Sequence, residues 1–244
     1  MSDKIKLRDF IEVEYTGKLA DGTVFDTTSK AVADANKLPT EKGHFAPAKI
    51  CVGERQLLTG LDEAFVDKEV GIEYTITLPV EKAFGKRDIK RVKIVPMSTF
   101  REHKMDPYPG LQVDMDGQIG LVTNVSGGRV IVNFNHPLAG KEVQYTFTIK
   151  QQITDDGEKL KTYIVATFHL PADKIKVEIK DEKATVQLPV DLPVQLTSVL
   201  VQKLQELIKL KEITFVKEEK KSEEKIPELK KEKKPSKKKE DVPG

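Results

Sequence analysis

The residue types that carry covalent or metal chemistry are few and scattered in this chain of 244 residues. Its four histidines share no metal-ligand spacing with the single cysteine, Cys51. Neither a glycine-rich phosphate loop nor a nucleophile-elbow pattern is present. We therefore expect any reaction here to proceed without a metal, a cofactor or a covalent intermediate.

A second group of residues gains its meaning from its order along the chain. The pieces are Val13-Glu14-Tyr15-Thr16-Gly17, Asp21-Gly22-Thr23-Val24-Phe25-Asp26, Gly53, Gly60-Leu61-Asp62 and Ala83-Phe84-Gly85. Each piece is unspecific by itself, because Tyr15 is most simply a core residue, Asp26 a turn residue and Phe84 a packing residue. Together, their order and spacing resemble the FKBP family of peptidyl-prolyl cis-trans isomerases.

The resemblance extends to an insertion from about Lys86 to Phe134. The insertion lies between Ala83-Phe84-Gly85 and Asn135-His136-Pro137-Leu138-Ala139-Gly140-Lys141. SlyD-like and long archaeal members of the family have this layout, and in them an inserted β-rich flap domain binds unfolded polypeptide. The match covers roughly residues 5–153. The unit that follows carries no motif that we can name, although long archaeal members have an extra domain there.

The resemblance implies an α+β fold. Its main part would be an FKBP-type antiparallel β-sheet wrapped on a short helix, joined by a small inserted β-rich flap domain and a small C-terminal α+β domain. We expect a discontinuous isomerase domain of residues 1–86 and 135–155, a flap domain of 87–134 and a C-terminal domain of 158–217. Residues 218–244 are nearly all Lys, Glu, Pro and Ser and cannot bury a core, so they are predicted to be a disordered tail.

Hydrophobic periodicity predicts the strands. Residues 10–19 alternate, with Ile11, Val13, Tyr15 and Leu19 on one face, which indicates a half-buried strand. Further strands are expected at 50–53, 73–78, 111–115, 119–125, 130–134, 143–153, 163–170, 175–179, 184–190 and 213–216.

Turn and capping signals predict what joins these strands. Asp21-Gly22 favours a tight hairpin, whereas residues 29–49 have the pattern of a surface loop. Thr59 and Asp62 resemble a capping box, which would begin a short helix. An amphipathic helix is expected after Pro193, because leucine and isoleucine recur there in steps of four.

The resemblance also implies the site residues. The catalytic set would be Tyr15, Phe25, Asp26, Leu58, Phe84 and Tyr145, and substrate contacts would come from Leu57, Leu61, Ala83 and Leu138. The first hairpin would supply Tyr15 and Asp26, and Tyr145 would close the pocket. Leu61 would form the floor, a position that holds tryptophan in many eukaryotic members; this chain has no tryptophan.

The implied reaction is the cis/trans isomerisation of X-Pro bonds in unfolded or nascent chains. Rotation about a peptide bond meets a barrier of about 18–20 kcal/mol, set by amide resonance. The twisted amide is less polar than the planar one, so an apolar slot favours the transition state. The Leu58 N–H and the Tyr15 hydroxyl would hold the substrate carbonyl, and Asp26 would orient Tyr15. The alternative is a non-catalytic module of the same fold that binds partners as a holdase.

The insertion contains the three methionines other than the initiator, Met97, Met105 and Met115, together with Phe100 and Tyr108. Flexible thioethers suit a surface that must fit many apolar sequences, so these side chains are candidates for contact with unfolded clients. The alternative is that a small domain uses methionine to fill gaps in its core. The family resemblance favours the chaperone interpretation.

Composition limits the partners. The formal net charge of +2 does not predict a nucleic-acid-binding protein, and the one cysteine excludes an intramolecular disulfide. No apolar stretch approaches the roughly 20 residues of a membrane-spanning helix. We therefore expect a cytoplasmic protein without membrane contact.

The C-terminal part leaves alternatives open. Asp155-Asp156-Gly157 has the pattern of a boundary, and the helix after Pro193 is either the core helix of a small domain or the interface of a homodimer. Contact of the lysine-rich tail with ribosomal or other RNA is the less favoured interpretation, because glutamates interleave with the lysines and no aromatic residues do.

Overall fold

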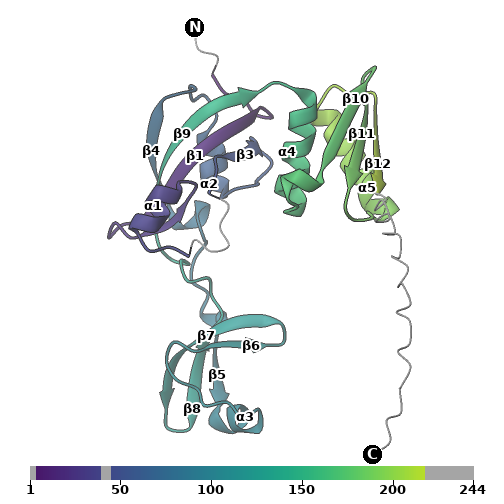
Figure 1. The fold of residues 1–244 in the computed structure, drawn as a ribbon. Helices are drawn as coiled ribbons and strands as arrows, with labels where there is room; N and C mark the ends of the chain where they lie inside the picture. Colours follow the sequence, from purple (N-terminus) through teal and green to yellow (C-terminus); the bar gives the residue numbers. More distant parts are fainter. Residues whose placement is uncertain (1–3, 40–44, 218–244) are drawn as a thin grey trace, which may run out of the picture.

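The computed structural model describes residues 4–39 and 45–217, so the tail predicted at 218–244 lies outside the described residues. The described chain contains three separate β-sheets (Figure 1). We call the parts built on them the main sheet, the flap and the C-terminal unit. None of the helices in these ranges has the length and apolarity of a membrane span.

The main sheet has five strands and is antiparallel throughout. Its strands are β1 (Phe10–Leu19), β2 (Val24–Thr27), β3 (Ala48–Cys51), β4 (Glu73–Leu78) and β9 (Val143–Ile153). Four of them run in the order β2-β1-β9-β4, and β3 also pairs with β1. The short helix α2 (Thr59–Ala64) packs on this sheet, where Leu61 joins the buried Ile11 and Val13 in one core. The α+β fold with an antiparallel sheet on a short helix is thus confirmed.

Two local expectations about the main sheet were wrong. The 29–49 segment contains a helix, α1 (Lys30–Ala35), whose N-terminus is capped by the Ser29 side chain accepting the Val32 N–H. At α2 the N-cap is Leu58, and no side chain caps the helix. The capping-box pattern misled because the Asp62 carboxylate accepts two other backbone N–H groups, which lie in the preceding turn.

The flap is a four-stranded antiparallel sheet in the order β5-β8-β7-β6. Its elements are β5 (Val92–Pro96), α3 (Met97–Glu102), β6 (Gln112–Met115), β7 (Gln118–Ser126) and β8 (Arg129–Asn133). The strands expected at 111–115, 119–125 and 130–134 are therefore confirmed, whereas β5 and α3 were missed. Figure 1 shows the flap set apart from the main sheet and reached by two chain segments. Two hydrogen bonds join these segments, because the Asn135 side chain accepts the Asp88 N–H at 2.8 Å and donates to the Asp88 carbonyl at 2.9 Å.

The C-terminal unit packs two helices with a three-stranded sheet. Its elements are α4 (Asp156–Phe168), β10 (Lys176–Lys180), β11 (Lys183–Leu188), α5 (Val194–Leu207) and β12 (Glu212–Lys217). The sheet order is β10-β11-β12, with β11 and β12 parallel. Helix α5 follows Pro193 as predicted, and Leu200 and Leu204 are buried on its inner face.

The strand expected at 163–170 was wrong, because these residues belong to α4. Their aromatic and β-branched side chains resemble a strand locally. Leu160, Tyr163 and Ile164, however, are spaced three and four apart and form one buried helix face. The Asp155 carboxylate caps this helix by accepting the Glu158 N–H at 2.7 Å. The expected boundary at Asp155-Asp156-Gly157 is therefore a helix start that follows β9 almost at once.

The C-terminal unit shares a core with the main sheet. Phe10, Cys51 and Ile153 of the main sheet belong to the same buried cluster as Leu160 and Ile164 of α4. Neighbouring strand residues point to opposite faces, so Phe10 faces the C-terminal unit while Ile11 faces the other core. The main sheet is consequently buried on part of both faces.

Candidate functional site

The main sheet and α2 bring most of the expected pocket residues into one cluster. Leu61 and Tyr145 are buried at its base. Partly buried apolar and aromatic side chains pack against this base: Tyr15, Phe25, Leu57, Leu58, Ala83 and Phe84. Strand β1, strand β2, the segment before α2 and the loop after β4 each contribute, which explains why the residues are dispersed along the sequence.

Edge-to-face ring contacts fix the shape of the pocket. Phe25 lies 5.7 Å from Phe84 and 5.7 Å from Tyr145, centroid to centroid, with interplanar angles of 77° and 88°. Tyr15 meets Tyr145 at 5.8 Å. Such T-shaped arrangements are favoured by the ring quadrupoles. The rings therefore pack as one continuous lining, in which Tyr145 is almost fully buried.

Two motif glycines are required by this packing. A Cβ atom at Gly17 would lie 2.7 Å from the Phe25 ring and 2.9 Å from the Tyr145 ring, both too close for carbon atoms. A Cβ atom at Gly60 would lie 2.8 Å from a methyl group of Leu78. Glycine at these positions lets β1 approach the rings and lets α2 approach β4.

Asp26 is the carboxylate of the pocket, and its partner differs from the expected one. The Tyr145 hydroxyl donates to Asp26 Oδ2 at 3.5 Å, whereas no hydrogen bond joins Asp26 to Tyr15 within the described residues. Burial raises the pKa of Asp26, and the hydrogen bond from Tyr145 works in the opposite direction. Burial and the nearby Asp26 charge raise the pKa of Tyr15 far above its usual value. The Tyr15 hydroxyl therefore stays protonated and able to donate.

The turn before α2 leads to a backbone donor that is unpaired within the described residues. The Leu58 N–H makes no hydrogen bond within the part of the chain that the structure describes. The carboxylate of Asp62, which is 2% exposed, accepts the N–H groups of Gly53 and Arg55 at 2.9 Å each. These two hydrogen bonds attach the turn to α2. Leu58, whose N–H is unpaired within the described residues, follows this turn closely in the chain.

His136, which was not among the expected site residues, lies beside Phe84. The His136 ring stacks on Phe84 with 4.5 Å between centroids and an interplanar angle of 4°. Its Nδ1 atom accepts the Leu138 N–H at 3.1 Å, while the Leu138 side chain is absent from the described core cluster. The sequence signal for His136 is its place in the motif that follows the insertion.

The flap residues divide into interior and surface. Phe100 is 2% exposed and belongs to the flap core, so the core-filling interpretation holds for this residue, and it offers no surface to a client. Met97 and Met115 are partly buried against that core, whereas Met105 and Tyr108 are exposed. The sequence analysis missed several large aliphatic side chains that are exposed on the flap: Ile89, Ile94, Ile119 and Leu121.

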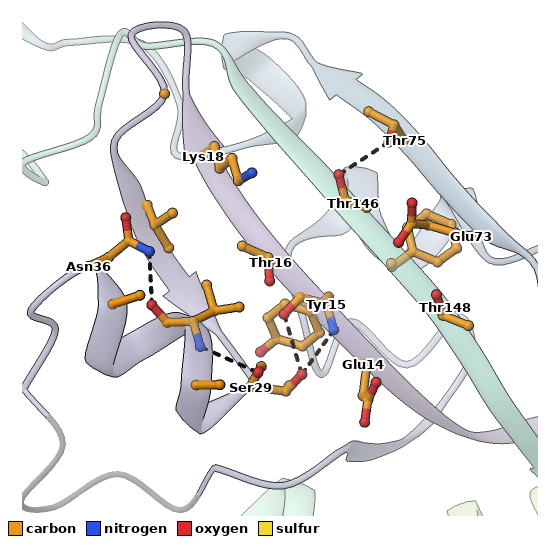
Figure 2. A pocket seen from close by; sticks show the side chains of 17 residues that line it. Glu14, Tyr15, Thr16, Lys18, Ser29, Asn36, Glu73, Thr75, Thr146 and Thr148 are labelled. Atoms are coloured by element: carbon orange, nitrogen blue, oxygen red, sulfur yellow. Dashed lines mark hydrogen bonds between the residues drawn. The ribbon is translucent and has the colours of Figure 1, made fainter.

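A cavity of about 730 Å³ lies on the other face of the main sheet, between its strands and α1 (Figure 2). Thr16, Thr75 and Thr146 stand side by side there on neighbouring strands, with Glu14 and Glu73 close by. Tyr15 and Phe147 also contribute to its lining, so the cavity adjoins the aromatic cluster. Its threonine and glutamate side chains would keep an amide hydrated, and we therefore assign the chemistry to the ring-lined pocket on the other face.

Comparison with known families agrees with this geometry. Residues 2–101 match the model of the family described as FKBP-type peptidyl-prolyl cis-trans isomerase. Residues 93–138 match the model described as the FKBP26 IF domain, which covers the flap.

Similar proteins carry the same description. A short-type peptidyl-prolyl cis-trans isomerase of Methanocaldococcus jannaschii is 33% identical over 150 residues, which cover 62% of this chain and 95% of that protein. The FKBP-type 16 kDa peptidyl-prolyl cis-trans isomerase of Escherichia coli is 27% identical over 154 residues, covering 61% of this chain and 94% of that protein. The SlyD isomerase of Haemophilus influenzae is 26% identical over 151 residues, covering 60% and 71%.

A solved structure of the three FKBP domains of wheat FKBP73 aligns with 64% of this chain and 43% of that chain, at 18% identity and a TM-score of 0.34. The sequence matches are the stronger observation, because the archaeal isomerase is covered almost over its whole length. The chain belongs to the FKBP-type peptidyl-prolyl cis-trans isomerases, in the SlyD-like arrangement with an inserted flap, and it catalyses the cis/trans isomerisation of prolyl peptide bonds.

Proposed function

We propose that the aromatic pocket catalyses this isomerisation by desolvating the X-Pro amide. The supporting observation is the apolar lining around Phe25, Phe84 and Tyr145, beside which Asp26 supplies a partly buried carboxylate. The planar amide is the more polar form, so removing water raises its free energy more than that of the twisted amide. A thousandfold acceleration needs only about 4 kcal/mol, so desolvation and a hydrogen bond suffice.

Two donors would hold the substrate carbonyl. The Leu58 N–H and the Tyr15 hydroxyl are both without a hydrogen-bond partner in the described chain. Asp26 engages Tyr145 instead, which leaves the Tyr15 proton available to substrate. Asp26 thereby acts in our proposal by placing negative charge beside the carbonyl carbon, and not by orienting Tyr15.

Tyr15→Phe tests the hydrogen-bond part of this mechanism. We expect kcat/KM for a short prolyl peptide to fall about tenfold, which corresponds to about 1.4 kcal/mol for one lost hydrogen bond. The measurement is a protease-free isomerisation assay. Tyr74→Phe is the matched control, because the Tyr74 hydroxyl accepts the Glu69 N–H at 3.1 Å and is not one of the proposed donors to substrate. Unchanged turnover in Tyr15→Phe would remove Tyr15 as a donor.

We also propose that the protein is a folding chaperone whose flap binds apolar segments of unfolded or nascent clients. The support is the set of exposed aliphatic side chains on the flap sheet, among which Ile119 is 70% exposed and Ile94 64%. Ile94 on β5 pairs with Ile131 on β8, and Leu121 on β7 pairs with Asn133, which is also on β8. An apolar patch on a small, separate sheet is typical of a surface that contacts other chains.

The proposed division of labour follows the chain. Residues 1–86 and 135–155 would isomerise, 87–134 would bind clients, and 158–217 would form the C-terminal domain, with a helix that starts two residues earlier, at Asp156. The three sheets support this division. The isomerase domain and the C-terminal domain share the core that contains Phe10 and Leu160. These two domains are therefore less independent of each other than the flap is of either.

A homodimer through the C-terminal domain is the finer proposal about partners. It is supported by exposed apolar side chains on α5, namely Val194, Leu196 and Val199. We expect Val199→Glu to shift the full-length protein from dimer to monomer in sedimentation equilibrium, because a charge would be buried between two copies. A wild-type chain that sediments as a monomer at high concentration would exclude the dimer.

A further inference from the structure

Glu54 connects the turn before α2 with the C-terminal unit. It lies in the turn that precedes Leu57 and Leu58, and its side chain is only 14% exposed. One carboxylate oxygen lies 2.8 Å from the Lys203 ammonium on α5. The other accepts the Tyr163 hydroxyl of α4 at 3.4 Å. Both partners of this largely buried carboxylate therefore come from outside the main sheet.

The surroundings make this contact consequential. A buried carboxylate needs a counter-charge and hydrogen bonds, and removing a partner leaves it uncompensated. Burial, followed by the Glu54 charge, raises the pKa of Tyr163 to about 12, so its hydroxyl remains a donor at working pH. The contact also adjoins the apolar core shared by Phe10, Cys51 and Ile153 with the C-terminal unit, which gives α4 and α5 a fixed base.

The same turn is held from its other side by α2. Asp62 accepts the N–H groups of Gly53 and Arg55, which flank Glu54 on either side. Arg55 has a φ of 54°, in the left-handed region that non-glycine residues adopt rarely. Gln56 in turn accepts the Cys51 N–H at 2.8 Å. An unusual backbone shape is thus maintained by several separate contacts.

We propose that Lys203 and Tyr163 are positioning residues for the isomerase pocket. By holding Glu54, they fix the turn that presents the Leu57 and Leu58 wall and aims the Leu58 N–H at the substrate carbonyl. This inference rests on the proposed pocket, since it concerns the placement of one wall of that pocket. It makes the C-terminal unit a part of the catalytic apparatus, although Lys203 lies far from Leu58 along the chain.

Lys203→Met tests the proposal in the full-length protein, because it removes the charge and keeps most of the side-chain length. We expect kcat/KM for a short prolyl peptide to fall about fivefold, and Lys203→Arg to restore most of it. In a double-mutant cycle with Glu54→Gln, the double variant should lose no more than the single variants, because both disrupt one contact. Hydrogen-exchange mass spectrometry should show faster exchange in peptides that contain residues 53–58, with the flap peptides unchanged.

The controls separate this role from a general loss of stability. Lys183→Met breaks an exposed ion pair with Glu212 in the same unit and should leave kcat/KM and exchange at the wild-type level. Tyr163→Phe keeps the ring in the core and removes only the hydroxyl, so it provides the test if Lys203→Met fails to fold.

Two outcomes would overturn the proposal, and a third would identify failure of the pocket instead. Wild-type kcat/KM in both Lys203→Met and Tyr163→Phe would show that the turn does not depend on these residues. Losses that multiply in the double-mutant cycle would show that Lys203 and Glu54 act separately. Failure of the proposed pocket is recognised differently. The Asp26→Ala/Phe84→Ala protein would then keep full isomerase activity, both with Lys203 intact and with Lys203 substituted.

Discussion

The Asp26→Ala/Phe84→Ala double variant should lose at least about a hundredfold in kcat/KM for a prolyl peptide, equivalent to about 2.7 kcal/mol of transition-state stabilisation. Phe84 contacts both Phe25 and His136, so its removal opens one wall of the pocket to water. The loss of Asp26 removes the buried charge and leaves the Tyr145 hydroxyl without its acceptor. A protease-free isomerisation assay measures the effect, and circular dichroism verifies the fold.

Phe100→Ala/Asp114→Ala is a matched control for this experiment. It removes the same side-chain types from the flap, where Phe100 is buried in the flap core and Asp114 is exposed. We expect this protein to isomerise peptide at the wild-type rate. If the pocket variant and the control retain equal activity, the catalytic centre lies elsewhere on the chain.

Removal of the flap should separate the two proposed activities. We expect a protein in which residues 87–134 are replaced by a short glycine linker to keep its activity on a short peptide and to lose at least about tenfold in the refolding rate of a proline-limited client. Bypassing the flap is geometrically reasonable, because the Gly140 N–H donates to the Gly85 carbonyl at 2.8 Å beside the two connecting segments. Equal refolding by the truncated and the full-length protein would contradict the chaperone proposal.

A surface variant makes this test more specific. Ile94→Ser, Ile119→Ser and Leu121→Ser together remove the exposed apolar side chains and leave the flap core in place. The matched control changes exposed aliphatic residues outside the flap: Ile72, Ile179 and Val216. Only the flap variant should match the deletion in the refolding assay. A flap variant that refolds the client normally would move client binding away from this face.

The parts of the fold that local pattern determines could be predicted. Strand β9 was expected at 143–153 and lies there, because its buried residues alternate cleanly. The flap turns at Asp116-Gly117 and Gly127-Gly128 are also of a predictable kind, because such dipeptides readily adopt the positive φ angles found there. Much of the candidate site also followed, since the resemblance rests on short motifs whose residues converge in the fold.

The parts that tertiary context determines could not be predicted. Tyr163, Ile164 and Val165 favour a strand by propensity, and only the shared core selects the helix α4. Phe100 and Tyr108 are both aromatic residues in the flap, and nothing local indicates that the first is buried and the second exposed. The Glu54–Lys203 contact joins residues whose separation in sequence gives no signal at all.

The place of β9 in the main sheet has a consequence for the protein's own biogenesis. This strand lies between β1 and β4, and it carries Tyr145, the base of the pocket. Chains are made from the N-terminus, so the sheet cannot close before residue 153 has left the ribosome. The flap strands, between residues 92 and 133, emerge earlier and pair only with one another. A nascent copy of this folding enzyme therefore has the chain for a complete flap before it has the chain for a complete active site.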